Sequence, residues 1–230
     1  DPAADLLARD IVLESDRTSF TAEYGGARVP VSLGIPGRFT VYNAMSVIGA
    51  ALGLGIALPD IAAALSRAQG VKGRVEVVPT PGTDYTVLID YAHTPDALEN
   101  VLRSVRDFCK GRLISVFGCG GDRDPIKRPI MGHIGVSLSD IAVITSDNPR
   151  TESPMAIIAD IVKGVKPGDG EYIVIEDRPA AIRYAMDIAE KNDIIVLAGK
   201  GHETYQDIGG HKRHLDEREE VAAHLTELRN

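Results

Sequence analysis

The chain has 230 residues, 44% of which are apolar, and a formal charge of −8 at neutral pH. This length suffices for one large domain or two small ones, and the apolar content is normal for a protein with a buried core. The acidic balance argues against a nucleic-acid-binding protein, because such proteins are usually basic. The sequence holds two cysteines, Cys109 and Cys119, and no apolar run of membrane-spanning length. We therefore expect a cytoplasmic protein with no disulfide framework, metal cluster or membrane anchor.

The first 70 residues read as a small β-rich region followed by helices. Short strands are predicted at 11–13, 18–24 and 28–32, with the turn signal Gly25-Gly26 between the last two. A helix over 41–54 is apolar almost all round, which predicts that it is buried, and a second helix spans 59–68. This region is too small for a complete α/β domain, so we interpret it as the end of a larger one. The start at Asp1-Pro2-Ala3 has neither Met nor a signal sequence, which also predicts a fragment or a processed chain.

A Gly-containing stretch over 69–73 is typical of a linker, and we place a domain boundary between residues 70 and 71. Beyond it, helix-like segments separate five strand-like runs that each end in Gly and charged residues, at 87–90, 113–117, 141–145, 172–175 and 194–197. This alternation predicts an α/β fold with a Rossmann-like, mostly parallel sheet and flanking helices. Because ligands bind beyond the carboxyl ends of parallel strands, we expect the five polar bursts to gather at one edge of the sheet.

The second burst, Gly118-Cys119-Gly120-Gly121-Asp122-Arg123-Asp124, follows a strand and precedes a helix. Its glycines would let the backbone approach a ligand, and the helix N-terminus favours an anion. Lys127 and Arg128 add cations one turn further on. Arg123 stands where the dinucleotide fingerprint would have its third Gly, so the loop is not that motif. Taken alone, a tight turn with solvated charges explains it about equally well.

The third burst, Asp147-Asn148-Pro149-Arg150, can present an amide and a guanidinium fork on a turn that Pro149 stiffens. This pair suits a carboxylate, although an ordinary turn is the simpler interpretation of the tetrapeptide in isolation. In the first burst, Asp90-Tyr91-Ala92-His93, the Asp could bond a ribose hydroxyl and Tyr or His could stack on a base. A structural role for these residues is the equal alternative.

The fifth burst, Gly199-Lys200-Gly201-His202-Glu203, places a lysine between two glycines. It lacks the upstream Gly and the following Ser or Thr of a Walker A loop, and no such loop occurs in the chain. A nucleotide triphosphate bound by this chain alone would lack its main phosphate cradle. We therefore expect no ligase or ATPase activity from the chain by itself.

Taken together, these motifs closely resemble those of the Mur ligases, which build the peptide of bacterial cell-wall precursors. The matching stretches follow the family's order over nearly the whole chain, at 37–43, 73–76, 88–98, 117–131, 145–151 and 196–206. Asp147-Asn148-Pro149-Arg150 is similar to the signature of members that add meso-diaminopimelate, rather than lysine, to UDP-N-acetylmuramoyl-L-alanyl-D-glutamate. The resemblance implies an ATP-dependent amide ligase of the bacterial cytoplasm, with ATP and Mg²⁺ as cofactors. Its partners would be the UDP-muramoyl dipeptide, meso-diaminopimelate and ATP.

Members of the family have three domains. By resemblance, residues 1–70 are the end of the central ATPase domain, and residues 71–230 are the whole C-terminal amino-acid-binding domain. The phosphate loop, a modified lysine and most Mg²⁺ contacts would lie upstream, so no catalytic residue is assigned to this chain. The residues that match nucleotide contacts are Asn43, Arg74, Asp90 and His93. Those that match diaminopimelate contacts are Arg123, Asn148, Arg150, Gly199 and Glu203.

Other interpretations remain open at this stage. A lysine-adding Mur ligase and a folylpolyglutamate synthase are the near alternatives. Arg150 disfavours the first, and the joint presence of the second and fifth bursts disfavours the second. A dinucleotide-binding oxidoreductase conflicts with the broken glycine fingerprint. A non-catalytic amino-acid-binding module is the remaining alternative.

Overall fold

The computed structural model describes residues 4–228, so the Asp1-Pro2-Ala3 start lies outside the described residues. The chain divides into two compact units, Asp1–Val71 and Lys72–Asn230. This division lies one residue from the boundary expected from the sequence. The assignment of the first unit to an ATPase domain stays a prediction.

The N-terminal unit is a three-stranded antiparallel sheet with two helices packed on it. Its strands pair in chain order as β1 (Leu6–Leu13), β2 (Thr18–Tyr24) and β3 (Ala27–Leu33). Gly25 and Gly26 both have positive φ angles, which suits the tight turn between β2 and β3. The helices are α1 (Arg38–Gly53) and α2 (Leu58–Leu65), and the buried core includes Phe20, Val31, Val41, Ile48 and Ile61.

The prediction that the first helix is buried all round is wrong. Thr40, Val41, Ala44 and Ile48 of α1 are buried, but the Tyr42 residue is 69% exposed. A single three-stranded sheet with one neighbouring helix covers only one stripe of α1. Apolar composition therefore indicated a helix correctly but overstated its burial.

The C-terminal unit contains a six-stranded sheet in the order β4-β5-β9-β6-β7-β8. Its strands are β4 (Glu76–Val78), β5 (Thr86–Asp90), β6 (Leu113–Phe117), β7 (Ile141–Ile144), β8 (Glu171–Val174) and β9 (Ile194–Ala198). β5 to β9 pair in parallel, and only β4 is antiparallel to its neighbour β5. The mostly parallel α/β fold expected from the sequence is confirmed. The last parallel strand, β9, inserts between β5 and β6, which places its C-terminal loop near the centre of the sheet edge.

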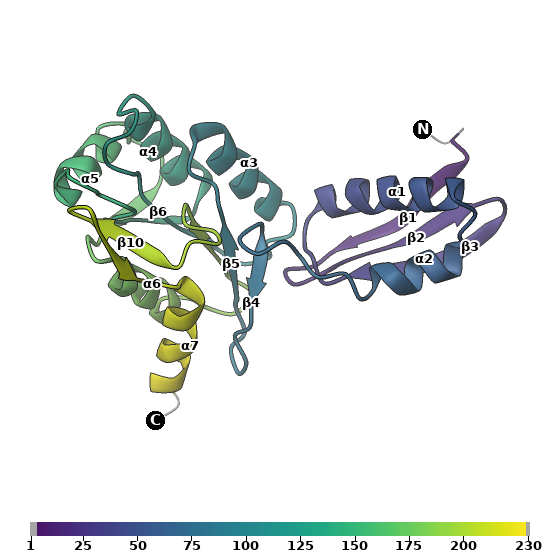
Figure 1. The fold of residues 1–230 in the computed structure, drawn as a ribbon. Coiled ribbons are helices and arrows are strands. Elements are labelled where there is room, and N and C mark those ends of the chain that lie inside the picture. Colours follow the sequence, from purple (N-terminus) through teal and green to yellow (C-terminus); the bar gives the residue numbers. More distant parts are fainter. Residues whose placement is uncertain (1–3, 229–230) are drawn as a thin grey trace. The chain divides into compact units, whose positions relative to one another are not determined.

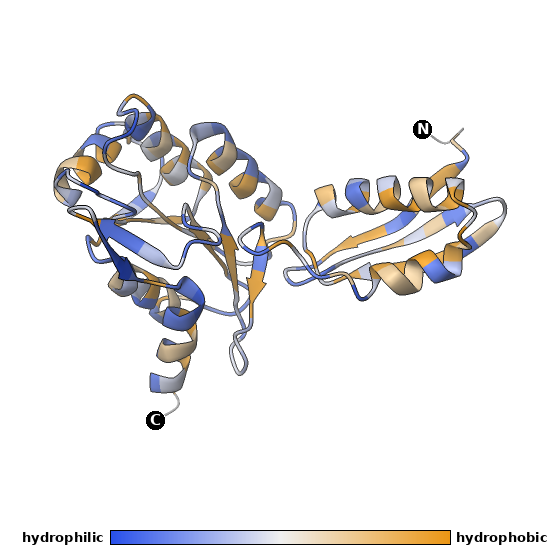
Figure 2. Cartoon of the chain, in the orientation of Figure 1, coloured by the Kyte–Doolittle hydropathy of each residue, from blue (hydrophilic) through white to orange (hydrophobic). Residues whose placement is uncertain are grey.

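Helices cover both faces of this sheet (Figure 1). The helices α3 (Pro95–Arg106), α4 (Lys127–Leu138) and α5 (Pro154–Val162) pack side by side on one face, and α6 (Arg178–Asp187) and α7 (Glu217–Glu227) lie together on the other. Thr94 caps α3 by accepting a hydrogen bond from the Ala97 amide, and Asp216 caps α7 through the Arg218 amide. With both faces covered, β5, β6 and β9 are apolar along nearly their whole length, as Figure 2 shows.

A small hairpin follows the central strand and was not predicted. Its strands, β10 (Tyr205–Ile208) and β11 (His211–His214), form a separate antiparallel pair joined by Gly209 and Gly210. Figure 2 shows the hairpin as mostly hydrophilic. A parallel bridge between Arg150 and Ile208 ties it to the loop after β7. The hairpin therefore brings a second segment of chain to the strand ends.

Candidate functional site

The loops that follow the five parallel strands lie against one another at one edge of the sheet, as expected. Hydrogen bonds join each loop to at least one other. The connections are Gly199 N to Asp90 O (3.0 Å), Lys127 Nζ to His93 O (2.7 Å), Gly121 N to Asn148 O (2.9 Å), Ser146 N to Glu176 O (3.2 Å) and Asn148 Nδ2 to Glu203 Oε2 (2.9 Å). These loops carry every site residue predicted for the C-terminal unit except Arg74.

A surface cavity of about 810 Å³ lies elsewhere on the C-terminal unit, away from the strand-end loops. Arg106, Asp140 and Glu171 are among its lining residues, and they belong to the opposite ends of the strands. Arg106 already pairs with Asp140 at 2.9 Å. The cavity therefore offers fewer unengaged charges than the strand-end loops, and we place the candidate site at those loops.

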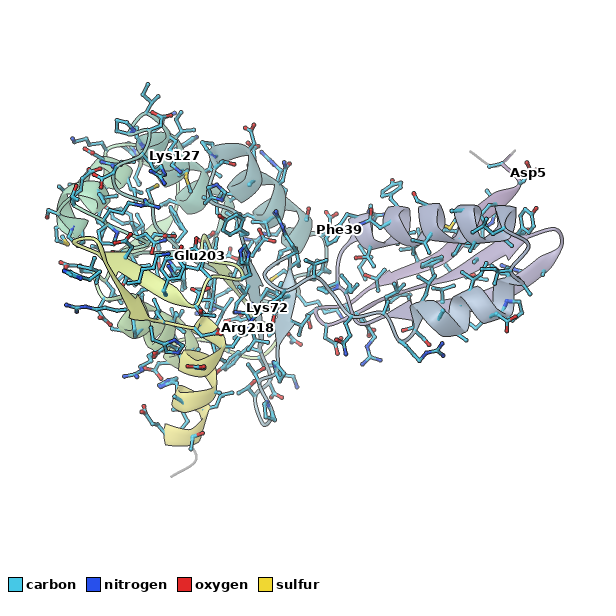
Figure 3. All side chains as sticks on the ribbon, viewed as in Figure 1. Asp5, Phe39, Lys72, Lys127, Glu203 and Arg218 are labelled. Atoms are coloured by element: carbon cyan, nitrogen blue, oxygen red, sulfur yellow. The ribbon has the colours of Figure 1, made fainter. Side chains whose placement is uncertain are left out.

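The centre of the site is a cluster of one buried cation, two carboxylates and an amide. Lys200 is fully buried, and its Nζ lies 3.1 Å from Asn148 Oδ1, 3.4 Å from Glu203 Oε2 and 3.9 Å from Asp147 Oδ1. Burial lowers the pKa of the Lys200 ammonium. The nearby Asp147 carboxylate acts in the opposite direction but does not outweigh burial. Figure 3 labels Glu203, which keeps part of its carboxylate surface exposed.

Hydrogen bonds fix the orientation of the Asn148 side chain. Its Oδ1 accepts from Lys200 Nζ and from the Asp207 amide at 2.9 Å, so its Nδ2 must face the other way. That nitrogen donates to Glu203 Oε2 at 2.9 Å. One N–H of Asn148 and the Oε1 of Glu203 are left for a ligand, since no bond joins them to other residues that the structure describes.

Arg150 is held in place by the hairpin. Its backbone φ angle of +51° is unusual for a residue other than Gly. The Arg150 amide donates to Asp207 O at 2.9 Å, and the Arg150 carbonyl accepts from the Gly209 amide at 2.6 Å. The Arg150 Nη1 donates to Gly121 O at 2.7 Å. Within residues 4–228 its Nε and Nη2 make no hydrogen bond, which leaves one edge of the guanidinium for an anion.

Two glycines serve to pack the loops against each other. A Cβ added at Gly121 would overlap the Pro149 carbonyl oxygen, and one at Gly199 would lie 2.5 Å from Asp147 Oδ2. Gly199 also has a φ of +119°, which disfavours any side chain. At Gly121 the small residue therefore allows contact between loops, and the expectation that the loop's glycines let a ligand approach the backbone stays a prediction.

The cations of the second loop have separate roles. Arg123 is exposed, and its Nη1 bonds only the neighbouring Asp122 carbonyl, at 3.0 Å. Arg128, by contrast, is buried between Glu152 at 2.8 Å and Asp160 at 3.0 Å. The interpretation of Arg128 as a ligand-facing cation is therefore wrong, because its charge is already neutralised inside the protein.

Three of the four residues predicted for the nucleotide lie around Tyr91. The Arg74 Cζ lies 5.6 Å from the centre of the Tyr91 ring, and the His93 ring centre lies 4.6 Å from it. His93 Nδ1 is 2.8 Å from the Tyr91 carbonyl oxygen. The His202 ring centre lies 5.1 Å from that of Tyr91, with the two ring planes tilted by 44°. His93 and His202 are exposed. Together with Tyr91 they form an aromatic surface that suits a planar base.

Asp90 is the last residue of β5, directly before Tyr91, and is almost completely buried. Its Oδ2 accepts a hydrogen bond from the Val75 amide at 2.9 Å. Burial raises the pKa of the Asp90 carboxyl, although this bond and the nearby Arg74 charge lower it. A backbone hydrogen bond from Ala92 also lowers this pKa. Asp90 therefore makes structural contacts with the backbone and remains only 7% exposed.

The fourth predicted nucleotide residue, Asn43, lies on α1 in the N-terminal unit and is exposed. It belongs to a different compact unit from Arg74, Asp90 and His93. Its part in a nucleotide site stays a prediction.

Sequence reasoning missed several residues of the site. Lys200 was considered only as a phosphate-binding lysine, and Asp147 and His202 were not assigned to a ligand. Tyr91 was considered for stacking on a base but was not among the predicted site residues. The signal for Lys200 was present, because a lysine between two glycines directly after a buried strand has little room to leave the protein interior. The hairpin contacts from Asp207 left no signal at all, since β10 and β11 were not predicted.

Within residues 4–228, no group of three or more His, Cys, Asp or Glu side chains is arranged to hold a metal ion. Among the described helices, none combines the length and the apolar character needed to cross a membrane.

Comparison with known proteins identifies the family of the chain. Residues 73–201 match the family described as "Mur ligase, glutamate ligase domain". A protein of Clostridium acetobutylicum named UDP-N-acetylmuramoyl-L-alanyl-D-glutamate–2,6-diaminopimelate ligase 1 is 52% identical over 226 residues, covering 98% of this chain and 46% of the relative. A solved structure of a UDP-N-acetylmuramoyl-L-alanyl-D-glutamate–2,6-diaminopimelate ligase is 33% identical with a TM-score of 0.83, over 100% of this chain and 47% of the other.

A folylpolyglutamate synthase from Thermotoga maritima shares the fold alone, at 21% identity and a TM-score of 0.64 over 85% of this chain and 44% of the other. This chain spans about half the length of the curated relatives it matches. The strand-end loops, the family match and the identity to these relatives lead to one conclusion: the chain belongs to the Mur ligase family.

Proposed function

We propose that the intact protein is an ATP-dependent amide ligase that adds meso-diaminopimelate to UDP-N-acetylmuramoyl-L-alanyl-D-glutamate, a step of bacterial peptidoglycan precursor synthesis. In this proposal residues 71–230 bind the incoming amino acid, and residues 1–70 belong to the ATPase domain. The names of the relatives support the proposal. The observation that carries it is that Arg150, which donates to Gly121 O, and the Asn148–Glu203 pair both belong to the strand-end loops at one edge of the sheet.

The distal end of diaminopimelate carries both a carboxylate and an ammonium. Arg150 and the remaining N–H of Asn148 would bind the carboxylate, and Glu203 with the Gly199 carbonyl would bind the ammonium. Exposed Arg123 would add a second positive charge near the first group. Lysine has no distal carboxylate, so Arg150 would face no anion, at a cost of roughly 1–3 kcal/mol. A loss of this size discriminates strongly between two amino acids.

The same edge would receive the nucleoside of ATP. We assign the base to the surface formed by Tyr91, His93 and His202, and the ribose to Asp90, with Arg74 and Asn43 as further contacts. The described residues hold no group suited to a metal, so Mg²⁺ would bind with the phosphates outside this chain. No step of the mechanism is therefore assigned to metal ligands here.

The reaction requires two substrates to meet. The D-glutamyl carboxylate takes the terminal phosphoryl group of ATP, which releases ADP and leaves an acyl phosphate. The amine of diaminopimelate then displaces phosphate and loses a proton as the amide forms. The residues of this chain would hold the amino acid by its distal end and aim its other amine at the acyl carbon, which is catalysis by positioning. In this proposal the reaction takes place in the bacterial cytoplasm, and its partners are the UDP-muramoyl dipeptide, meso-diaminopimelate and ATP.

The test is the substitution Arg150→Ala in the intact enzyme. A charge-assisted bond is worth roughly 1.5–3 kcal/mol, so we expect the KM for meso-diaminopimelate to rise about ten- to a hundredfold. The KM for ATP should stay within about twofold of the wild type, because Arg150 lies away from the nucleotide residues. Arg213→Ala, an exposed arginine on the neighbouring β11, is the matched control and should change neither value. Equal effects on both KM values would contradict the role given to Arg150.

A further inference from the structure

Lys200 has an unusual environment for a lysine at a binding site. It is fully buried, so a ligand at the site surface would not touch it. Two carboxylates, Asp147 and Glu203, lie within 4 Å of its ammonium, and Tyr205 lies beneath it with its ring centre 5.7 Å away. Burying an ammonium without a partner raises the free energy of the folded state, so Lys200 depends on its contacts with both carboxylates.

The charges of this cluster do not cancel. One ammonium and two carboxylates leave a single negative charge. An incoming ammonium would neutralise it, which matches the cationic part of a zwitterionic amino acid. Without Lys200 the two carboxylates would face each other with no cation between them, and like charges in a closed site repel.

Lys200 also determines which atoms of Asn148 face the ligand. The Asn148 Oδ1 accepts from Lys200 and from the Asp207 amide, so a flipped amide would place its NH₂ group against two donors. The Nδ2 then donates to the same Glu203 oxygen that Lys200 approaches. Lys200 therefore connects the Asn148 amide, which would donate to the ligand's carboxylate, with the Glu203 carboxylate, which would accept from the ligand's ammonium.

We propose that Lys200 is a positioning residue of the amino-acid site: its buried ammonium fixes the Asn148 amide and the Glu203 carboxylate so that they recognise the zwitterionic end of the substrate. This inference rests on the proposed function, because it takes diaminopimelate as the substrate. It differs from the contacts assigned above in that Lys200 acts without touching the ligand.

The experiment compares Lys200→Met with Lys212→Met in the intact enzyme. Both lysines lie over the ring of Tyr205, but Lys212 is exposed, with its Nζ 4.0 Å from the ring centre. Lys200→Met should raise the KM for meso-diaminopimelate at least about tenfold and leave the KM for ATP within about twofold. Lys212→Met should match the wild type in both. Equal KM values for Lys200→Met and the wild type would overturn the inference, and so would parallel changes for both substrates.

A double-mutant cycle with Glu203→Gln separates positioning from a general loss of structure. If Lys200 acts through Glu203, the Glu203→Gln substitution should raise the KM for diaminopimelate much less in the Lys200→Met background than in the wild type. Additive effects would overturn the inference. Thermal unfolding of each variant checks that it is folded. If Lys200→Met does not fold, Lys200→Arg keeps the charge but displaces its partners, and it must still raise the KM for diaminopimelate selectively.

The wild-type reaction distinguishes this inference from the proposed function. If the wild type uses lysine in preference to diaminopimelate, the proposed function fails, whatever the variants do. If the wild type adds diaminopimelate and Lys200→Met behaves like Lys212→Met, the proposed function stands and the inference about Lys200 fails.

Discussion

At the scale of single residues, the Asp90 carboxylate has a structural role and a proposed binding role. One oxygen accepts a hydrogen bond from the Val75 amide inside the protein, and the residue directly precedes Tyr91 at the end of β5. A substitution at Asp90 therefore has two possible consequences, and the choice of replacement separates them. Asparagine keeps the acceptor for Val75, whereas alanine removes it.

We expect Asp90→Asn to raise the KM for ATP by about three- to tenfold, because the loss of charge weakens a hydrogen bond to the ribose. The KM for diaminopimelate should change little. Asp90→Ala should in addition lower the free energy of unfolding by about 1–3 kcal/mol, since the buried Val75 amide loses its partner. Steady-state kinetics and urea unfolding measure the two effects. An unchanged KM for ATP in Asp90→Asn would leave Asp90 with a structural role alone.

The limits of prediction at this scale are visible in two arginines. Arg128 and Arg150 both follow the ends of parallel strands, and the sequence favoured both as ligand-facing cations. Arg128 is enclosed by Glu152 and Asp160, which lie more than twenty residues away in the chain. Only the three-dimensional structure brings these partners to it. The position of Arg150 at the sheet edge was predictable from local sequence, because it follows Pro149 in the turn directly after a strand.

At the scale of elements, opposite ends of the parallel strands have different tasks. The C-terminal ends carry the site, and the N-terminal ends of β6 and β9 are joined by Arg112 and Asp193. The buried Asp193 carboxylate accepts from the Arg112 amide at 2.6 Å, from Arg112 Nη2 at 2.7 Å and from the Glu190 amide at 2.9 Å. Burial raises the pKa of Asp193, but these hydrogen bonds outweigh it and lower the pKa overall.

This lowered pKa predicts how stability depends on pH. A carboxylate whose pKa is lower in the folded state stabilises the protein above its unfolded pKa, and this contribution is lost as the pH falls through the folded pKa. At pH 7 we expect Asp193→Asn to lower the free energy of unfolding by roughly 1.5–3 kcal/mol. The difference from the wild type should shrink below about pH 4. Urea unfolding between pH 3 and pH 7 measures it.

Glu190→Gln is the matched control for this prediction. Glu190 approaches the same Arg112, at 3.4 Å, but its side chain is largely exposed. An exposed ion pair contributes about 0–1 kcal/mol, so this variant should be nearly as stable as the wild type at every pH. A constant difference between Asp193→Asn and the wild type down to pH 3 would exclude ionisation as the source of its stability.

Elements were predictable where a local pattern determined them. The five parallel strands are runs of aliphatic and β-branched residues, and Thr94 with Pro95 marked the start of α3. The three-residue β4 and the hydrophilic hairpin of β10 and β11 have no such run. The insertion of β9 between β5 and β6 was also not predicted, because strand order depends on the crossover that returns the chain to the sheet centre.

At the scale of the whole molecule, the division into two units predicts where the chain is accessible to a protease. Residues 66–72 are exposed and lie outside regular secondary structure, and they include Arg67 and Lys72. We expect limited trypsin digestion to cut first at one of these two residues, which would leave the C-terminal unit intact. Mass spectrometry of the early products identifies the site.

A double substitution, Arg67→Gln with Lys72→Gln, is the control for this digestion and should delay the first cut. A first cut inside residues 75–228, for example at the exposed Lys212 of the hairpin, would contradict the division into two stable units. The boundary itself was predictable because Gly and polar residues interrupt the apolar pattern at 69–73. The assignment of the first unit to an ATPase domain rests on the family resemblance alone and stays a prediction.

The central claim is that this domain selects an amino acid with a distal carboxylate. It is tested most directly by giving the intact wild-type enzyme equal concentrations of meso-diaminopimelate and L-lysine, with ATP, Mg²⁺ and UDP-N-acetylmuramoyl-L-alanyl-D-glutamate. The two products differ in mass by one carboxyl group, so mass spectrometry reports their ratio. We predict that nearly all of the product contains diaminopimelate, and that Arg150→Ala moves the ratio toward lysine. A wild-type product that contains mainly lysine would contradict the account.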